Sequence, residues 1–184
     1  MSPLDIANRM GAMALSLVLG AALPASTARA ETSMVSPNGF LVTHRIEVKA
    51  APEQLFAAIG HPERWWSGEH TFSGNAANLS LGMAAGDCFC ERWDGGSVEH
   101  GRVIYVGRNQ AVRVLGAFGP LQGLAVTGVM TFGVAAKEGK TFLQLTYRVS
   151  GNADAGLDKL AGPVDAVIGE QARRLAAFVD GATP

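Results

Sequence analysis

The apolar residues of this chain change their spacing once, from every second residue to every third or fourth. Between residues 78 and 149 they alternate with polar residues, as in strands that bury one face. From Pro163 onward they follow a helical period, and one stripe then contains Val164, Val167, Ile168, Ala172, Leu175, Phe178 and Val179. A long amphipathic helix must bury such a stripe. We therefore expect an antiparallel sheet to wrap around a C-terminal helix.

The remaining elements follow from local patterns. Pro52 begins a short helix that closes at Gly60, and a second helical turn follows at 62–66, before a polar loop over 67–77. Glycines inside strands, such as Gly101, Gly128 and Gly133, indicate bends in a strongly curved sheet. The predicted class is α+β, with two short helices after the first strand and residues 40–180 forming one domain. Strands are predicted over residues 40–48, 78–81, 87–93, 97–106, 110–117, 126–135 and 141–149.

The first 30 residues have the pattern of a secretory signal peptide. Arg9 supplies positive charge, the stretch Gly11 to Leu23 is apolar, and Ala28-Arg29-Ala30 fits the small-x-small cleavage pattern. The apolar stretch is shorter than the ~20 residues that span a bilayer, and no later stretch is long enough. We predict cleavage near Ala30, a periplasmic or secreted location, and an N-terminal extension over 31–39 before the domain.

Composition excludes two classes of protein. With 48% hydrophobic and 17% charged residues the chain is not disordered, and with 15 Lys and Arg against 16 Asp and Glu it is not a basic nucleic-acid module. Nucleophile elbows, phosphate-binding glycine loops, zinc-protease helices and dinucleotide fingerprints are absent from the sequence. We expect no cofactor and no nucleic-acid partner.

Three sequence segments resemble a known superfamily. The run from Thr43 to Phe56, with its Ala51-Pro52 step, is similar to the opening strand and first helix of START/SRPBCC proteins. Trp65-Trp66, followed by Gly86-Asp87-Cys88-Phe89 and a glycine-rich hairpin, resembles the heat-shock-protein ATPase activator-like branch, near the polyketide cyclase-like proteins. The resemblance implies a helix-grip fold with an apolar cavity. It also implies binding of lipids, sterols or other hydrophobic molecules, catalysis in a minority of members, and chaperone contact in some.

The resemblance also suggests which residues would contact a ligand. Trp65 and Trp66 follow the short helices near the expected cavity mouth, and the apolar loop around Phe118 could be a gate or could pack over one end. Plain core packing is the alternative for each candidate. The predicted ligand-binding set is Trp65, Trp66, Phe118, Met130, Phe132, Leu143, Leu145, Tyr147, Val167, Ile168 and Leu175.

Acid–base candidates are few. His44 lies on the apolar face of the first predicted strand, while Glu91, Glu99 and His100 occupy the hairpin strands. A catalytic role requires His44, Glu91 or His100 to project into the cavity with a shifted pKa. The alternative is a structural histidine and exposed carboxylates, and our prediction is that none of these residues is catalytic.

Cys88 and Cys90 are the only cysteines, and at i and i+2 in a strand their side chains point the same way. With a three-residue loop at Asp94–Gly96, Cys90 faces His100, and the three side chains could hold a soft metal. A two-residue turn puts Glu91 or Phe89 opposite His100 instead. A disulfide needs a bulge, because i and i+2 Cβ atoms lie too far apart in a regular strand. We expect two buried thiols and no metal.

These observations lead to three hypotheses. The first is an exported protein that binds a small hydrophobic molecule in an internal cavity without catalysis. The second is a polyketide cyclase-like enzyme that acts on a hydrophobic substrate in the same cavity. The third is an envelope interaction module, which predicts a filled interior and an exposed apolar patch around Trp65, Trp66 and Phe118.

Overall fold

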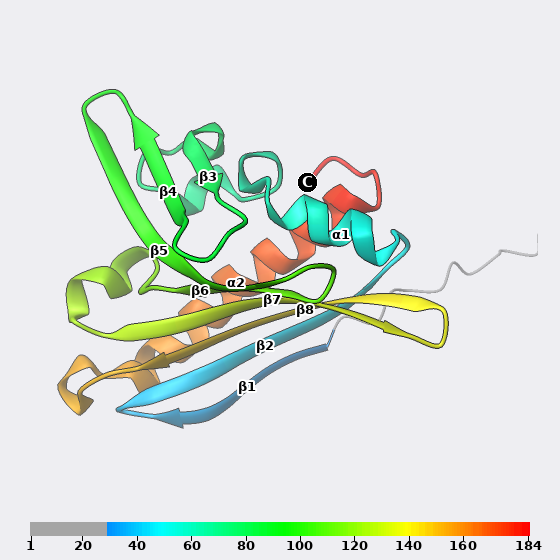
Figure 1. Ribbon diagram of the computed structural model, residues 1–184. Helices are drawn as coiled ribbons and strands as arrows, with labels where there is room; N and C mark the ends of the chain where they lie inside the picture. The colour runs from blue at the N-terminus through cyan, green and yellow to red at the C-terminus, as the bar shows by residue number, and fades with distance from the viewer. Residues whose placement is uncertain (1–28) are drawn as a thin grey trace, which may run out of the picture.

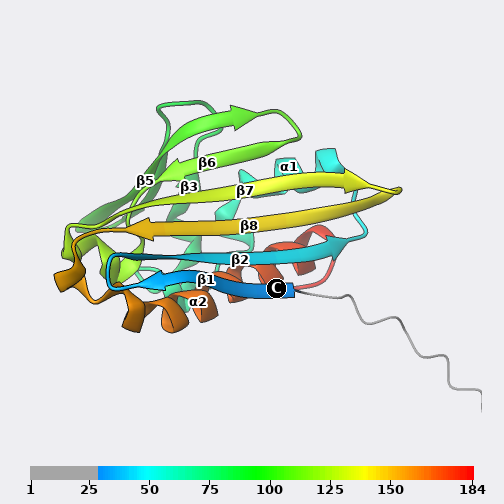
Figure 2. The same ribbon diagram turned by 90° about the horizontal axis from the view of Figure 1, so that it is seen from below.

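A computed structural model of the chain describes residues 29–184. It contains an eight-stranded antiparallel sheet that curves around a long helix (Figure 1). The strand order is β1-β2-β8-β7-β6-β5-β4-β3. Figure 2 shows the part of this order that runs β5-β6-β7-β8-β2-β1, with these strands side by side. The predicted α+β class, with its sheet wrapped around a C-terminal helix, is confirmed. The strands are β1 (Arg29–Ser36), β2 (Gly39–Val48), β3 (Leu79–Leu81), β4 (Cys88–Trp93), β5 (Gly96–Gly107), β6 (Ala111–Leu115), β7 (Thr127–Lys137) and β8 (Lys140–Ser150).

Two α-helices and several 3₁₀ turns complete the described residues. Pro52 is the first residue of α1, where its missing N–H costs no hydrogen bond, and Gln54 accepts a hydrogen bond from the backbone N–H of Ala51 (2.9 Å). The α-helices are α1 (Pro52–Ile59) and α2 (Leu157–Val179), and the 3₁₀ turns are η1 (Pro62–Arg64), η2 (Gly68–His70), η3 (Ala76–Asn78), η4 (Gly119–Leu124) and η5 (Ala153–Ala155).

The long helix begins earlier than its stripe of apolar residues predicts. It starts at Leu157, directly after Gly156, whose φ of 60° suits glycine. Leu157 and Ala161 are buried and extend the stripe by more than a turn. Pro163 therefore lies inside α2 rather than in its first turn, and it cannot donate a hydrogen bond to the preceding turn.

Strand β1 occupies the segment that we predict as an N-terminal extension. It pairs with β2 in antiparallel register, Ala30 opposite His44, with an irregularity between Ser33 and Ser36. It lies at the sheet edge, and the side chains of residues 30–36 are exposed or half-buried. Such a strand needs no apolar alternation, so its sequence gives no strand signal. The predicted cleavage point near Ala30 falls within β1, and residues 1–28 of the predicted signal peptide lie outside the described residues.

The sheet turns at β5, so that β3 and β4 stand away from the flatter part formed by the other strands (Figure 1). At Gly101 the neighbouring strand comes close, because a Cβ there would lie 2.7 Å from the carbonyl oxygen of Leu115. Only glycine accommodates that approach. The predicted bend at Gly101 therefore has a steric basis in the packing of β5 against β6.

The β4–β5 hairpin has a different register from the three-residue loop considered above. Trp93 pairs with Gly96 across a two-residue turn, and Cys90 pairs with Glu99 rather than with His100. The register then shifts at a bulge between Phe89 and Cys90, which leaves His100 as the extra residue of β5.

The two cysteines form a disulfide across this bulged segment, with their Cα atoms 5.4 Å apart. That separation lies within the range that disulfides span. The prediction of two free thiols is therefore wrong. It fails because the bulge of the hairpin cannot be read from the spacing of Cys88 and Cys90.

Candidate functional site

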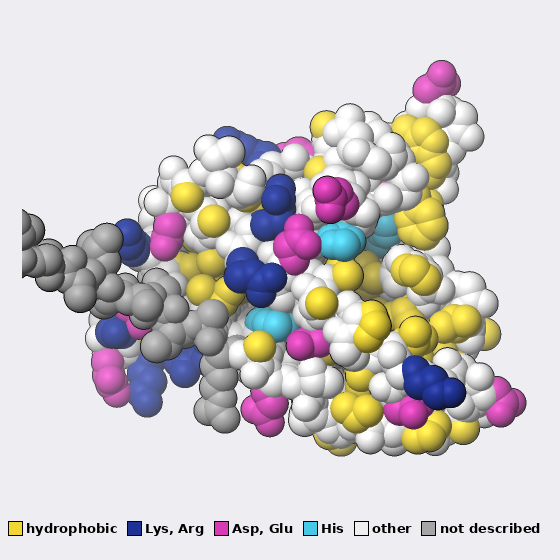
Figure 3. All heavy atoms as spheres, turned by 180° about the vertical axis from the view of Figure 1, so that it is seen from behind, with side chains coloured by type: hydrophobic (Ala, Val, Ile, Leu, Met, Phe, Trp, Pro, Cys, Tyr) yellow, Lys and Arg dark blue, Asp and Glu magenta, His cyan; other side chains and the backbone are white. Residues whose placement is uncertain are grey.

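A cavity of about 710 Å³ lies at one end of the molecule, between the first half of α2, η4, strands β5 and β8, and residues 67–73 around η2, here called the η2 segment. Its walls are mostly apolar. On the face seen in Figure 3, hydrophobic side chains gather on the side away from the grey N-terminal segment, and histidine side chains lie beside them. The lining residues are Trp66, Glu69, His70, Thr71, Phe72, His100, Phe118, Gly119, Pro120, Leu121, Leu124, Tyr147, Leu160, Pro163, Val164, Val167 and Ile168.

The predicted ligand-binding set divides into two groups. One group lines the cavity and consists of Trp66, Phe118, Tyr147, Val167 and Ile168. The other packs in the core beside the cavity, largely where the strands meet α1 and the second half of α2, and it consists of Trp65, Met130, Phe132, Leu143, Leu145 and Leu175. Both groups are inward-facing apolar residues. The sequence does not distinguish a side chain that lines a cavity from one that packs against a helix.

Several lining residues are absent from the predicted set. The η2 segment contributes Glu69 to Phe72, although its sequence predicts only a polar loop. The apolar loop around Phe118 continues into η4, which closes one side of the cavity. The apolar character of that loop is the one sequence signal that could have identified η4 as a wall.

The three aromatic residues that an interaction module is expected to expose are buried. Trp65, Trp66 and Phe118 are only 0%, 6% and 9% exposed. The neighbouring interior is hollow rather than filled. The expected exposure of Trp65, Trp66 and Phe118 and the expected filled interior beside them are therefore not found.

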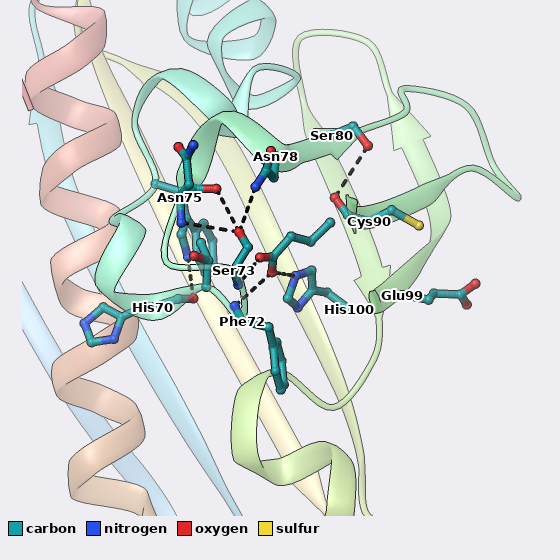
Figure 4. Close-up of polar contacts among 12 residues, drawn as sticks. His70, Phe72, Ser73, Asn75, Asn78, Ser80, Cys90, Glu99 and His100 are labelled. Atoms are coloured by element: carbon teal, nitrogen blue, oxygen red, sulfur yellow. Dashed lines mark hydrogen bonds and ion pairs between the residues drawn. The ribbon is translucent and has the colours of Figure 1, made fainter. Parts of the chain in front are cut away.

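A buried glutamate–histidine pair lies beside the cavity, and its histidine is one of the lining residues. Glu91 on β4 is fully buried, and its Oε2 lies 3.0 Å from Nε2 of His100 on β5. The same carboxylate accepts hydrogen bonds from the backbone N–H groups of Phe72 (3.0 Å) and Ser73 (2.5 Å). Figure 4 shows His100 beside the Phe72–Ser73 backbone. The pair therefore fixes the η2 segment to the hairpin, and the imidazole of His100 reaches the cavity.

The two members of this pair hold different charges at neutral pH. Burial raises the pKa of Glu91, but hydrogen bonds from the Ser73 side chain, the two backbone N–H groups and His100 together bring it below its ordinary 4.5. Burial lowers the pKa of His100 below its ordinary 6.5, despite the opposing effect of Glu91. Glu91 is thus a carboxylate and His100 a neutral imidazole.

Tyr147 reaches the cavity from β8, and its hydroxyl forms two hydrogen bonds with backbone groups. The hydroxyl donates to the carbonyl of Gly116 (3.1 Å) and accepts from the N–H of Phe118 (3.0 Å). Burial raises the pKa of Tyr147 to about 12. Gly128 leaves room for the ring, because a Cβ there would lie 2.6 Å from it. Tyr147 therefore anchors the loop that leads into η4.

A second histidine–carboxylate pair joins the η2 segment to α2. Nε2 of His70 lies 3.0 Å from Oε2 of Glu170, and both side chains are about one-third exposed. Burial raises the pKa of Glu170, but hydrogen bonds from His70 and Ser67 and the charges of His70 and Arg174 outweigh it and lower the pKa. The backbone N–H of Ser67 also donates to Gln171 (2.8 Å). These contacts hold the η2 wall against the helix.

The remaining acid–base candidates lie outside the cavity. Nε2 of His44 is 2.8 Å from Oδ1 of Asp165, and this contact ties β2 to α2. Neither residue lines the cavity. Glu99 is exposed, forms an ion pair with Arg102, and points away from His100 (Figure 4).

The candidate metal ligands do not assemble. Cys88 and Cys90 are bonded to each other, and the Cys90 side chain points away from His100 (Figure 4). Over residues 29–184, no group of three or more His, Cys, Asp or Glu side chains is placed to hold a metal ion. The sulfur–imidazole set considered from the sequence is therefore contradicted.

Comparison with solved structures shows which fold this is. The chain is similar to protein MLL2253 from Mesorhizobium loti (18% identity over 76% of this chain and 96% of that one, TM-score 0.56). It is also similar to the Aha1 dimer from Colwellia psychrerythraea (19%, 78% and 98%, 0.56) and to CalU16 from Micromonospora echinospora (11%, 87% and 86%, 0.55). No family model and no curated protein matches the sequence.

At these identities the likeness shows the fold alone. The curved antiparallel sheet and the long C-terminal helix form a helix-grip fold, as the sequence resemblance implies. Within the described residues, no helix is both long and apolar enough to cross a membrane. Fold and site together define a helix-grip protein with an apolar cavity beside its long helix.

Proposed function

We propose that this protein is exported, with cleavage near Ala30, and binds a small hydrophobic molecule in its cavity without changing it chemically. The observation that carries the proposal is the cavity itself. Its volume of about 710 Å³ lies within the range of small-molecule sites, ~300–1,000 Å³. Its walls are mainly aliphatic and aromatic, so burial of an apolar ligand surface would supply the binding free energy.

The cavity wall also carries exposed apolar side chains. Phe72 is 53% exposed and Leu124 is 41% exposed, on the η2 segment and η4 respectively. Side chains of this size at the surface favour a contact that removes them from water. They support a route by which an apolar molecule enters between η2 and η4.

Native mass spectrometry of the mature chain tests this proposal. We expect one small molecule per chain, retained under native conditions and released by denaturation. If the protein has lost its ligand during purification, incubation with a panel of fatty acids, sterols and polycyclic aromatics is expected to restore a one-to-one complex. A bare polypeptide mass in both experiments would contradict the proposal.

The second candidate function is acid–base catalysis, as in a polyketide cyclase-like enzyme. His100 satisfies the condition stated above, since it lines the cavity, has a lowered pKa, and is backed by the Glu91 carboxylate. The molecule recovered by mass spectrometry distinguishes the two functions. If its mass and fragmentation are unchanged after long incubation with fresh protein, the binding function stands, and conversion to a new species would favour the enzyme.

A further inference from the structure

The two ring nitrogens of His100 have different surroundings. Nε2 contacts the carboxylate of Glu91, whereas Nδ1 has no hydrogen-bond partner among residues 29–184. Within the same residues, no side-chain nitrogen or oxygen that is sealed from solvent lacks a partner. Nδ1 is therefore not sealed in the protein, and His100 is one of the residues that line the cavity.

The protonation of the pair decides what Nδ1 can do. The Glu91 carboxylate can only accept hydrogen bonds, and it already accepts two from the backbone N–H groups of Phe72 and Ser73. Nε2 of His100 must therefore carry the proton and donate. Because His100 is neutral, Nδ1 is left with a lone pair. It is an acceptor that needs a donor from the ligand.

Three aromatic rings lie around the His100 acceptor. Its ring lies 5.4 to 6.3 Å from the rings of Phe72, Phe89 and Phe118, and it is nearly parallel to that of Phe118. Glu91 is the charged group that faces it. An apolar ligand that left Nδ1 without a donor would desolvate it, and a buried polar group without a partner is unfavourable.

The other polar groups on the cavity wall are already committed or lie near the surface. The Thr71 hydroxyl donates to the carbonyl of Gly68 (2.8 Å), and the Tyr147 proton is donated to Gly116. Glu69 is exposed, and His70 is paired with Glu170. His100 is thus the buried acceptor that a ligand would meet within the aromatic part of the wall.

We infer that the molecule bound in this cavity is a hydrophobic alcohol or phenol, whose hydroxyl donates a hydrogen bond to Nδ1 of His100. This inference rests on the proposed binding function and specifies its ligand class. Glu91 acts as a positioning residue, because it fixes the tautomer and orientation of the imidazole. A carboxylate ligand is disfavoured, since the adjacent Glu91 is negative and His100 supplies no positive charge.

The test compares two probes of nearly equal size, 2-naphthol and 2-methylnaphthalene, at neutral pH. The measured quantity is the ratio of their dissociation constants. We expect the dissociation constant of 2-methylnaphthalene, divided by that of 2-naphthol, to be about ten times larger in the wild type than in His100→Phe. That variant keeps an aromatic ring and removes the acceptor. The matched control is His44→Phe, because His44 also pairs with a carboxylate but lies outside the cavity. It should retain the wild-type ratio.

A second measurement on the wild type covers the case in which His100→Phe does not fold. With ¹⁵N-labelled histidine, we expect the Nδ1 resonance of His100 to shift on addition of 2-naphthol but not of 2-methylnaphthalene. Equal ratios in wild type and His100→Phe, or identical spectra with both probes, would overturn the inference and leave the binding function intact. Binding of neither probe would count against both.

Discussion

Replacing Trp65 with alanine is expected to lower the free energy of unfolding by about 3–5 kcal/mol. The indole is fully buried, and its Nε1–H donates to the carbonyl of Ala58 (2.9 Å). Its ring centroid lies 5.5 Å from that of Trp66 and 6.1 Å from that of Phe132. The substitution would remove these ring contacts and the hydrogen bond to the Ala58 carbonyl, which would keep only the N–H of His61 as a donor, and it would leave a void between α1 and the sheet.

Urea-induced unfolding of the two proteins measures this effect. Trp93→Ala is the matched control, because Trp93 lies at the end of the β4–β5 hairpin and is only half-buried. We expect the control to cost about 1 kcal/mol or less. Equal losses for Trp65→Ala and Trp93→Ala would show that Trp65 is not a central core residue.

Replacing Glu91 with leucine is expected to cost about 3–5 kcal/mol, even though leucine suits a buried position. Glu91 accepts hydrogen bonds from His100 and from the backbone N–H groups of Phe72 and Ser73. Each donor that loses its partner in a buried place costs about 1–3 kcal/mol. The exposed Glu99→Leu, on the adjacent strand, is the control and should change stability by less than about 1 kcal/mol. Similar losses for both variants would contradict the role assigned to Glu91.

The same pair gives stability a defined pH dependence. The pKa of His100 is lowered below 6.5 in the folded chain, so the unfolded chain takes up a proton first and stability falls as pH drops below about 6.5. The pKa of Glu91 is lowered below 4.5 in the folded chain. Its contribution to the free energy of unfolding is therefore complete above pH 4.5 and is lost as the pH falls below that value. Wild type is therefore expected to lose more stability between pH 7 and 4 than the double variant Glu91→Leu/His100→Phe. Parallel pH profiles would contradict this.

Sequence periodicity predicts most of the fold because period two and period 3.6 reflect which side of an element is buried. It fails where burial leaves no pattern. Strand β1 is exposed at the sheet edge, so residues 29–36 show no alternation. The start of α2 at Leu157 depends on Gly156, whose left-handed conformation is not distinguishable in sequence from an ordinary loop glycine.

The site is less predictable because its chemistry depends on register and on backbone atoms. Pairing of Glu91 with His100 follows from a bulge in the hairpin, and Glu91 is held by two backbone N–H groups of the η2 segment. The backbone N–H groups that bind Glu91 have no side-chain signature. Trp66 and Phe118 are predictable as cavity residues, since large aromatics beside short helices and in an apolar loop suggest a boundary of the core.

The central claim is that the cavity is a binding site, and a dye titration tests it most directly. The dye N-phenyl-1-naphthylamine fluoresces more strongly in apolar surroundings, so its signal reports binding to the cavity. We expect saturation at one dye per chain in the wild type and in Ala166→Trp, whose new side chain lies on the exposed face of α2. Val167→Trp should weaken binding about tenfold or more, because its indole occupies the cavity that Val167 lines. Equal dye affinity in the two tryptophan variants, or no saturable binding in the wild type, would contradict the claim.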